Sequence, residues 1–431
     1  MINKVKLCIY LANIYLFTMI LPVVSRFLEI RVAGVSIFSV QLWKAIFILT
    51  TLFMFSSVLT KKNMLLLFYY TLVVMMITNI RRGRIFGVTI WMDRITIPLL
   101  IVILLYDLFI AKNDPHSLKL IVITSLVMIF ISCIINIRGL LLNPYAARMV
   151  GGDTALEIAR TGISGYGFHS GLPPLIPPLV LWAKKTDNKL QKSFLYGFAT
   201  IVMITVFLGA FTAPLLLAIA GFALSMVGQN IFHKGYSIIV VLVIVLLLIV
   251  VPPNVLISKA LLGLANIAPT EEVRVRVTDI ETAISSGVEI DAETRVETTA
   301  EGRIKRYYYN YEVFMRNPLF GNRESISGDG HLFWAYQLAL FGIVGFSALI
   351  WVLVNIIKTL LAHLRGEYRF FYWLSLGLLI VMGLMKVILG DFMFFIPLFL
   401  SPAILLYLQN QENSNNNSSA GSTPNQKEQL R

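Results

Sequence analysis

Long apolar runs separated by short polar breaks dominate the chain. A helix needs roughly 20 mostly apolar residues to cross the hydrocarbon core of a bilayer, so each run of that length predicts a transmembrane helix. Twelve runs along the chain meet this description, and they predict an all-α, polytopic integral membrane protein. The predicted spans are 7–24, 35–59, 64–80, 85–110, 118–137, 169–183, 193–209, 212–228, 236–252, 332–357, 370–388 and 391–408.

Proline interrupts the sixth predicted span. Because proline removes a backbone donor, we expect a broken or half-length helix there, satisfied by neighbouring protein or a wet cavity. The prolines concerned are Pro173, Pro174, Pro177 and Pro178.

The polar segments divide the chain into four regions. Residues 1–252 hold spans one to nine, with an outer loop at 138–168. Residues 253–331 form a large, helical loop between spans nine and ten, and residues 332–408 hold the last three spans. The polar segment 409–431 is predicted to be a disordered tail, because it offers little apolar surface to bury.

Composition excludes a soluble enzyme and makes orientation the next question. The chain is 57% hydrophobic and 14% charged, with a mean hydropathy of +0.77, whereas soluble domains are about 45–50% apolar and about 25% charged. Lysine-rich short loops fall on one side when both termini are placed inside, as the positive-inside rule requires. We therefore expect a multi-pass protein of a bacterial inner membrane, with cytoplasmic termini and both long loops on the periplasmic face.

The net charge of +13 separates into two populations of cations. The loops predicted to be cytoplasmic carry mostly lysine, and the outer connections carry mostly arginine. Arginine presents a planar fork that binds phosphate oxygens bidentately, so the outer face is predicted to bind a phosphate-bearing, lipid-linked anion and no nucleic acid. Pairing with acids of the same loop is the alternative for Arg274, Arg276 and Arg295.

Three arginines, Arg81, Arg82 and Arg84, lie in a very short outer connection. They oppose the positive-inside preference locally, and anion binding at the membrane surface is one reason for such an arrangement. The alternative is that one span is miscounted and that this turn is cytoplasmic.

Charged residues inside the predicted spans are functional candidates, because burying an ion costs at least about 2.5–3.5 kcal/mol. Structural pairing between helices is an equal alternative for each of them. The candidates are Lys44, Asp93, Arg94, Asp107, Lys386 and Asp391.

The large loop contains a predicted helix of about three turns, from Arg303 to an Asn-Pro stop after Arg316. Three- and four-residue spacings place four of its residues on one face, which suits a phosphate with an attached sugar. These residues are Arg303, Arg306, Tyr307 and Asn310. Packing or a place in the interfacial belt is the alternative for the tyrosines.

Histidines supply the candidate general bases. His331 follows a glycine-bounded turn at the outer mouth of span ten, beside Asp329. A histidine there can accept a proton from a hydroxyl nucleophile near neutral pH. His169, before the proline-broken span, is a secondary candidate, and the histidines lack the spacing of a zinc site. A structural role is the alternative for a lone histidine.

The segment EGRIKRYYYNYEVFMRNPLFGNRESISGDGHLFWAYQLALFGIVG, residues 301–345, resembles the late loop of the O-antigen ligase and O-antigen polymerase superfamily. The shared pattern is a Gly-Arg helix start, an aromatic helix, NPLFG, and a histidine opening a span that ends in a Gly-Ile-x-Gly turn. Outside this segment the resemblance is one of architecture, with about twelve spans and one large loop late in the chain.

The resemblance implies a metal-independent, GT-C-like glycosyltransferase that needs no cofactor and acts on undecaprenyl-pyrophosphate-linked glycans. Arg303 corresponds to the arginine that contacts the pyrophosphate, and His331 to the histidine proposed as the base. The family often has Ser-Arg at the outer start of a middle helix, where this chain has residues 208–214, LGAFTAP. The arginine is missing, and its role would pass to other outer arginines: Arg81, Arg82, Arg84 or Arg138.

We expect a polysaccharide polymerase that transfers a growing glycan from undecaprenyl pyrophosphate to a sugar hydroxyl of a lipid-linked repeat unit. Its expected partners are the lipid-linked oligosaccharide, membrane lipids and a chain-length regulator. An O-antigen ligase with a lipid A core or protein acceptor is the nearest alternative. A transporter or flippase of lipid-linked sugars and a structural assembly partner are the others, although no paired repeat typical of transporters is visible.

Overall fold

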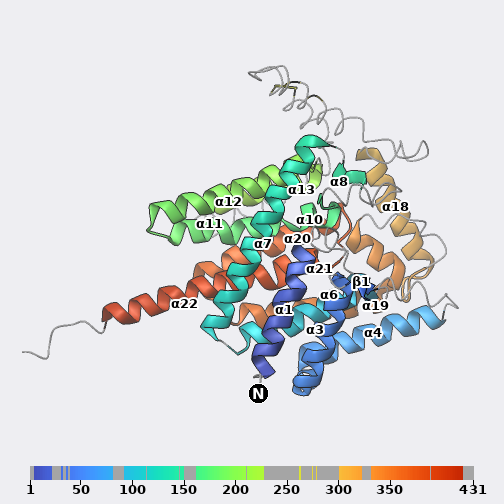
Figure 1. Ribbon diagram of the computed structural model, residues 1–431. Coiled ribbons are helices and arrows are strands. Elements are labelled where there is room, and N and C mark those ends of the chain that lie inside the picture. Colours follow the sequence, from blue (N-terminus) through green and yellow to red (C-terminus); the bar gives the residue numbers. More distant parts are fainter. Residues whose placement is uncertain are drawn as a thin grey trace, which may run out of the picture.

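A computed structural model gives the structure of the protein, and the part it describes is almost entirely helical (Figure 1). Its strands are β1 (Arg31–Val32) and β2 (Val35–Ser36), which form a short antiparallel pairing. The structure describes residues 4–21, 31–32, 35–36, 39–80, 92–112, 114–144, 146–149, 162–209, 211–227, 262–263, 274, 278, 300–322, 332–388 and 390–420.

The first part of the described chain alternates α-helices with short 3-10 and π-helical turns. Its elements are α1 (Lys4–Ile20), α3 (Val40–Met54), η1 (Ser56–Thr60), α4 (Lys62–Ile80), η2 (Met92–Thr96), α6 (Ile97–Leu105), η3 (Tyr106–Ile110), α7 (Pro115–Leu142) and α8 (Ala146–Met149). The second part begins at the proline-rich segment and ends near the C-terminus. Its elements are α10 (Tyr166–Gly171), η4 (Pro173–Leu175), α11 (Ile176–Lys185), α12 (Lys189–Leu208), α13 (Thr212–Val227), α18 (Ala300–Arg316), α19 (Phe333–Leu361), α20 (Gly366–Met385), α21 (Asp391–Phe395), η6 (Ile396–Leu400) and α22 (Ser401–Ala420).

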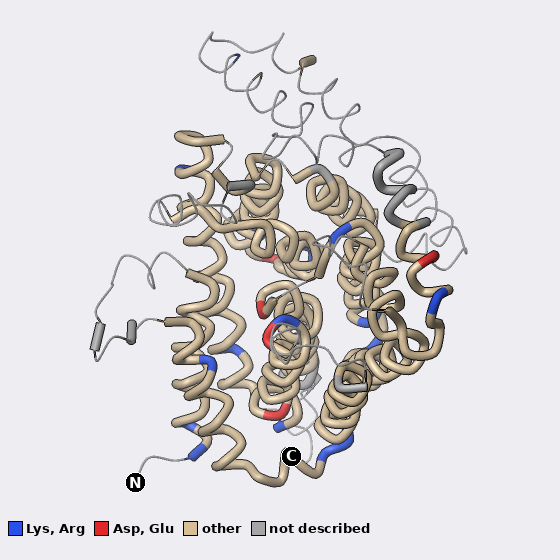
Figure 2. The backbone as a smooth tube through the Cα atoms, turned by 90° about the vertical axis from the view of Figure 1, so that its right-hand side faces the viewer, with Lys and Arg blue, Asp and Glu red and all other residues tan. Residues whose placement is uncertain are grey.

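Helix length and composition indicate a membrane protein. Within the described residues, five helices are long and apolar enough to cross a bilayer: Pro115–Leu142, Lys189–Leu208, Phe333–Leu361, Gly366–Met385 and Asp391–Ser414. Large apolar side chains point outward from the bundle, as in α3, where Phe53 is 84% and Leu49 is 66% exposed. Figure 2 shows how sparse the charged positions are along the described helices. The helical class is confirmed, whereas the number of twelve spans and the large loop remain predictions.

The sixth predicted span is broken, as its prolines indicate. Helix α10 is followed by the 3-10 turn η4 and then by α11, whose residues from Ile176 to Ala183 are buried. The hydroxyls of Ser375 and Ser401 donate hydrogen bonds to the carbonyl of Pro174, at 2.7 and 3.0 Å. Neighbouring helices therefore satisfy a backbone group that the break leaves available. Helix α11 packs against α12, α13, α20 and α22 and lies at the centre of the bundle.

The last helix continues past 408 into the segment predicted to be a disordered tail. Helix α22 ends at Ala420. Polar contacts explain the extension, because Gln409 accepts a hydrogen bond from the backbone N–H of Arg365 at 2.8 Å and donates one to the carbonyl of His363 at 3.0 Å. The first part of the predicted tail is therefore helical and tied to the α19–α20 connection.

An ion-paired group defines one end of the bundle. Lys44 on α3 pairs with Asp93 on η2 and with Asp391 on α21. These three helices therefore begin side by side, and we call this end of the bundle the Asp391 end.

A second ion-paired group defines the other end. Lys185, at the end of α11, pairs with Glu367 on α20 and with Glu412 on α22. Asp391 and Glu412 belong to one uninterrupted helical run, α21–η6–α22. At 1.5 Å per residue that run separates the two groups by about 30 Å, the thickness of a hydrocarbon core. We call this second end the Lys185 end.

Candidate functional site

Three charged side chains from three helices meet at the Asp391 end. The Nζ atom of Lys44 lies 3.1 Å from Oδ1 of Asp93 and 3.0 Å from Oδ2 of Asp391. The side chains of Lys44 and Asp391 are 6% and 10% exposed, whereas that of Asp93 is 50% exposed. We call these three residues the Lys44 cluster. The sequence singled out each residue and left open pairing between helices, and the structure shows such pairing.

Local structure explains where the two acids of the cluster sit. Asp93 and Asp391 each lie in the first turn of a helical segment, where the helix dipole favours a negative charge. The backbone N–H of Gly390 donates a hydrogen bond to the carbonyl of Arg94 at 3.1 Å. This bond fixes the start of α21 against η2 and holds the two acids near each other.

The histidine His169, a secondary candidate for substrate binding, is fully buried. Its Nε2 and Nδ1 atoms each lie 3.2 Å from a backbone carbonyl, those of Ser164 and Thr205. Its ring also contacts the ring of Phe211, at 5.6 Å between centroids. Both ring nitrogens face backbone carbonyls and the side chain has no exposed surface, so His169 packs inside the protein, which is the structural alternative left open for a lone histidine.

Gly209 lies directly against the ring of His169. A Cβ atom added to Gly209 would lie 2.7 Å from Nδ1 and 2.9 Å from Cγ of His169. Any side chain at this position would collide with the imidazole ring.

Helix α18 presents the predicted Tyr307 and Asn310 toward the protein. The hydroxyl of Tyr307 donates a hydrogen bond to the carbonyl of Leu384 at the end of α20. Asn310 is 7% exposed and Val313 is 1% exposed. These side chains therefore attach α18 to the bundle, which is the packing alternative left open for the tyrosines.

The structure places the remaining predicted residues only in part. Arg138 is exposed near the end of α7. The backbone of α18 includes Arg303 and Arg306, but their side chains lie outside the described residues. The whole of five further candidates also lies outside them: Arg81, Arg82, Arg84, Asp329 and His331. The described residues therefore do not test whether these groups converge.

A pair of glycines joins the turn after α18 to an interruption in α19. Gly321 and Gly342 have φ values of +69° and +64°, in the left-handed region that favours glycine. A Cβ atom on Gly321 would lie 2.6 Å from the carbonyl oxygen of Ala339 and from the nitrogen of Gly342. One on Gly342 would meet the carbonyl oxygen of Leu319. The backbone of the turn after α18 thus touches the backbone of α19, and neither Gly321 nor Gly342 has room for a side chain.

Three backbone hydrogen bonds hold this contact together. Asn322 N–H donates to the carbonyl of Ala339 at 2.8 Å, Ile343 N–H to that of Pro318 at 2.9 Å, and Val344 N–H to that of Leu319 at 3.1 Å. Helix α19 is interrupted at Gly342, and carbonyl groups of the turn accept the hydrogen bonds of the backbone N–H groups that follow the interruption. We call this contact the glycine junction; it fixes the end of α18 on α19, at the right of Figure 1.

The residue after His331 is held in an unusual conformation. Leu332 is buried and has φ of 65°, the one non-glycine residue with positive φ in the described chain. Such a conformation costs of order 1–3 kcal/mol and tends to occur at functional sites. Phe333 N–H donates to the carbonyl of Lys386 at 3.2 Å, so the start of α19 is fixed against the α20–α21 connection. The sequence offers no signal for this strain, because leucine does not favour positive φ.

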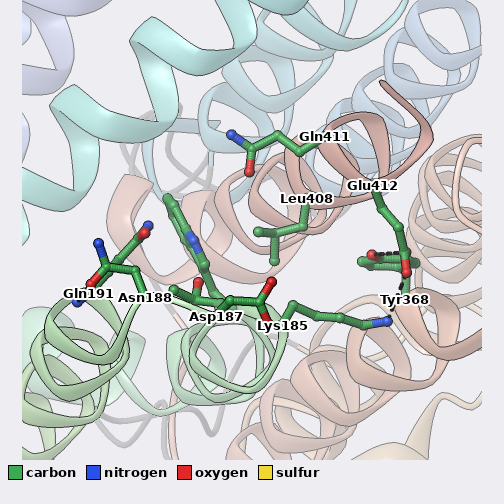
Figure 3. A pocket seen from close by; sticks show the side chains of 10 residues that line it. Lys185, Asp187, Asn188, Gln191, Tyr368, Leu408, Gln411 and Glu412 are labelled. Carbon is green, nitrogen blue, oxygen red and sulfur yellow. Dashed lines mark hydrogen bonds and ion pairs between the residues drawn. The ribbon is translucent and has the colours of Figure 1, made fainter. Parts of the chain in front are cut away.

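A pocket of about 490 Å³ opens at the Lys185 end (Figure 3). Trp182, Leu408 and Tyr368 are buried residues that contribute apolar surface to it, and Glu412 accepts a hydrogen bond from the Tyr368 hydroxyl at 2.6 Å. None of the residues predicted to bind substrate lines this pocket. The pocket and the Lys44 cluster are therefore two separate features, one at each end of the bundle.

Comparisons with known proteins do not identify a family for this chain. No protein-family model, no curated protein and no solved structure matches the chain. Within the part of the chain that the structure describes, no group of three or more His, Cys, Asp or Glu side chains could hold a metal ion.

Proposed function

We propose that this chain is a membrane-embedded polysaccharide polymerase of the O-antigen or capsule type. It transfers a growing glycan from undecaprenyl pyrophosphate to a sugar hydroxyl of a lipid-linked repeat unit, on the periplasmic face of a bacterial inner membrane. The resemblance of residues 301–345 to the O-antigen ligase and polymerase superfamily suggests this reaction.

The glycine junction is the observation that carries the proposal. The motif NPLFG and the motif LFGIVG, which together mark the resemblance, are the two halves of this backbone contact. The contact fixes the end of α18 (Ala300–Arg316), the helix whose backbone includes Arg303, on α19, which begins at Phe333, two residues after His331 in the sequence. This contact supports the proposal because it ties the predicted phosphate-binding helix to the helix that follows the candidate base in the sequence.

In the proposed reaction, the oxygen of the acceptor hydroxyl forms a bond to the anomeric carbon of the donor glycan. The bond from that carbon to the pyrophosphate oxygen breaks, and undecaprenyl pyrophosphate leaves. His331 takes the proton of the hydroxyl. Arg303 and Arg306 neutralise the charge that develops on the leaving pyrophosphate, assisted by outer arginines: Arg81, Arg82, Arg84 or Arg138.

The orientation of the protein is tested by labelling single cysteines. Leu319, in the turn after α18, and Leu190, at the start of α12, are 57% and 82% exposed. In a variant without Cys8 and Cys133, both of which are buried, we expect a membrane-impermeant maleimide to label Leu319→Cys in intact spheroplasts. Leu190→Cys should react only after the membrane is opened. Labelling of Leu190→Cys alone would reverse the proposed orientation.

The polymerase itself is tested by the surface glycan of cells that lack the gene. Polysaccharide is extracted from these cells and separated on a gel, with and without the wild-type protein. Single repeat units attached to the lipid core of the null cell, restored to a long ladder by the protein, support a polymerase. Long chains that accumulate on undecaprenyl pyrophosphate identify a ligase instead. Loss of all periplasmic repeat units identifies a transporter.

A further inference from the structure

We propose that the Lys44 cluster is a binding site for the acceptor sugar, in which Asp93 accepts hydrogen bonds from sugar hydroxyls. Lys44 and Asp391 are positioning residues that hold the carboxylate of Asp93 in place. The inference rests on the proposed function and adds to it the group that recognises the acceptor.

The carboxylate of Asp93 is placed to meet a ligand. Its side chain is 50% exposed, while its two partners are almost completely buried. The ion pair engages Oδ1 of Asp93, so Oδ2 remains to accept hydrogen bonds from a ligand. Asp93 also belongs to η2, a π-helical turn, and such turns occur frequently at functional sites.

Stability alone does not explain the cluster. Lys44 is 5% exposed and lies in the second turn of the apolar helix α3, close to the positive end of the helix dipole. Buried ion pairs are often no more stabilising than apolar residues of similar size. The arrangement therefore serves to hold a carboxylate at the edge of the bundle.

Electrostatics indicates the chemical class of the ligand. Within the Lys44 cluster two carboxylates face one ammonium, so these three side chains present a net negative charge to a phosphate. Among the described residues, the guanidinium of Arg94 makes no ion pair with either acid. Lys44 already occupies the position between the acids that a cation would take. A neutral ligand with several hydroxyl donors, such as a sugar ring, fits this site best.

The position of the cluster agrees with a role in acceptor binding. The α20–α21 connection begins at Lys386, whose carbonyl binds Phe333 N–H, and it ends at Asp391. This connection can span at most about 18 Å. An acceptor sugar at Asp93 therefore lies within reach of the start of α19 at Phe333, two residues after the candidate base His331 in the sequence.

Direct binding of an oligosaccharide tests the site. The probe is the repeat-unit oligosaccharide, freed of lipid and phosphate by mild acid from the lipid-linked glycan of the cells that make this protein. The full-length protein is held in lipid nanodiscs, and its affinity is measured by calorimetry. Because a hydrogen bond to a charged group is lost, Asp93→Asn is expected to raise the Kd by at least about tenfold.

The chain supplies a matched control at the Lys185 end. Asp107 is a buried aspartate that, like Asp93, lies in a π-helical turn, η3, and its Oδ1 atom lies 2.6 Å from Nζ of Lys61. Asp107→Asn removes a similar ion pair and is expected to leave the oligosaccharide Kd unchanged. For the positioning role, Asp391→Asn should raise the Kd and Asp391→Glu should restore part of the affinity, at equal Tm.

The outcomes separate the site from the proposed function. Unchanged affinity in Asp93→Asn, or an equal loss in Asp107→Asn, overturns the site even if the protein extends chains. Loss of affinity in Asp93→Asn alone supports the site. If the wild-type protein binds the oligosaccharide through Asp93 and does not extend chains, the polymerase proposal fails and the site stands.

Discussion

Alanine in place of Gly342 is expected to destabilise the folded protein by roughly 2–4 kcal/mol and to abolish chain extension. The added Cβ would collide with the carbonyl oxygen of Leu319, and the residue would keep a φ of +64°, which alanine rarely adopts. The turn after α18 must then move away from α19, and the three hydrogen bonds of the glycine junction break. Helix α18 would lose its fixed end.

The thermal unfolding of the detergent-solubilised protein measures this effect. Gly377→Ala is the matched control, because Gly377 lies inside α20 and an added Cβ there meets nothing within 4 Å. We expect Gly342→Ala to lower the Tm and Gly377→Ala to keep it or raise it slightly. Equal Tm values for the two variants would show that the junction does not hold α18 in place.

Alanine in place of His331 or Arg303 is expected to leave the protein folded and to reduce chain extension strongly. Removing a general base costs about 10²–10⁴ in rate, and removing a group that stabilises developing charge costs about 10²–10³. Arg303→Lys should recover only part of the activity, because lysine lacks the bidentate fork.

Arg316→Ala is the matched control for Arg303→Ala. Arg316 lies on the same helix, in its last turn, and is exposed. The Arg316→Ala variant should therefore extend chains at the wild-type rate. The readout is the rate of glycan lengthening at equal amounts of inserted protein. Wild-type rates in His331→Ala would remove this residue from the mechanism, and equal losses in Arg303→Ala and Arg316→Ala would point to a general effect of charge.

The features of the fold that depend on local sequence were predictable. Apolar runs predicted the long helices, such as Phe333–Leu361, because crossing a bilayer requires length and low polarity. The four prolines from Pro173 to Pro178 predicted the break between α10 and α11 for an equally local reason.

Features that depend on distant partners were not predictable. Lys44 stood out as a charge in an apolar span, but its partners Asp93 and Asp391 come from other helices. The glycines of NPLFG and LFGIVG were visible as motifs, and only the packed structure shows that Gly321 and Gly342 touch. The sequence left open whether His169 has a structural role, and only the packed structure shows that Gly209 and Phe211 lie against its ring. A polar tail sequence did not reveal that Gln409 extends α22.

Reconstituted chain extension tests the central claim most directly. The purified protein is placed in liposomes with undecaprenyl-pyrophosphate-linked repeat units, and the length of the lipid-linked glycan and the released undecaprenyl pyrophosphate are measured together. The account predicts that glycans of two or more repeat units appear, with one undecaprenyl pyrophosphate released for each bond formed, and that His331→Ala and Arg303→Ala prevent both. Repeat units that remain single in the presence of folded wild-type protein would contradict it.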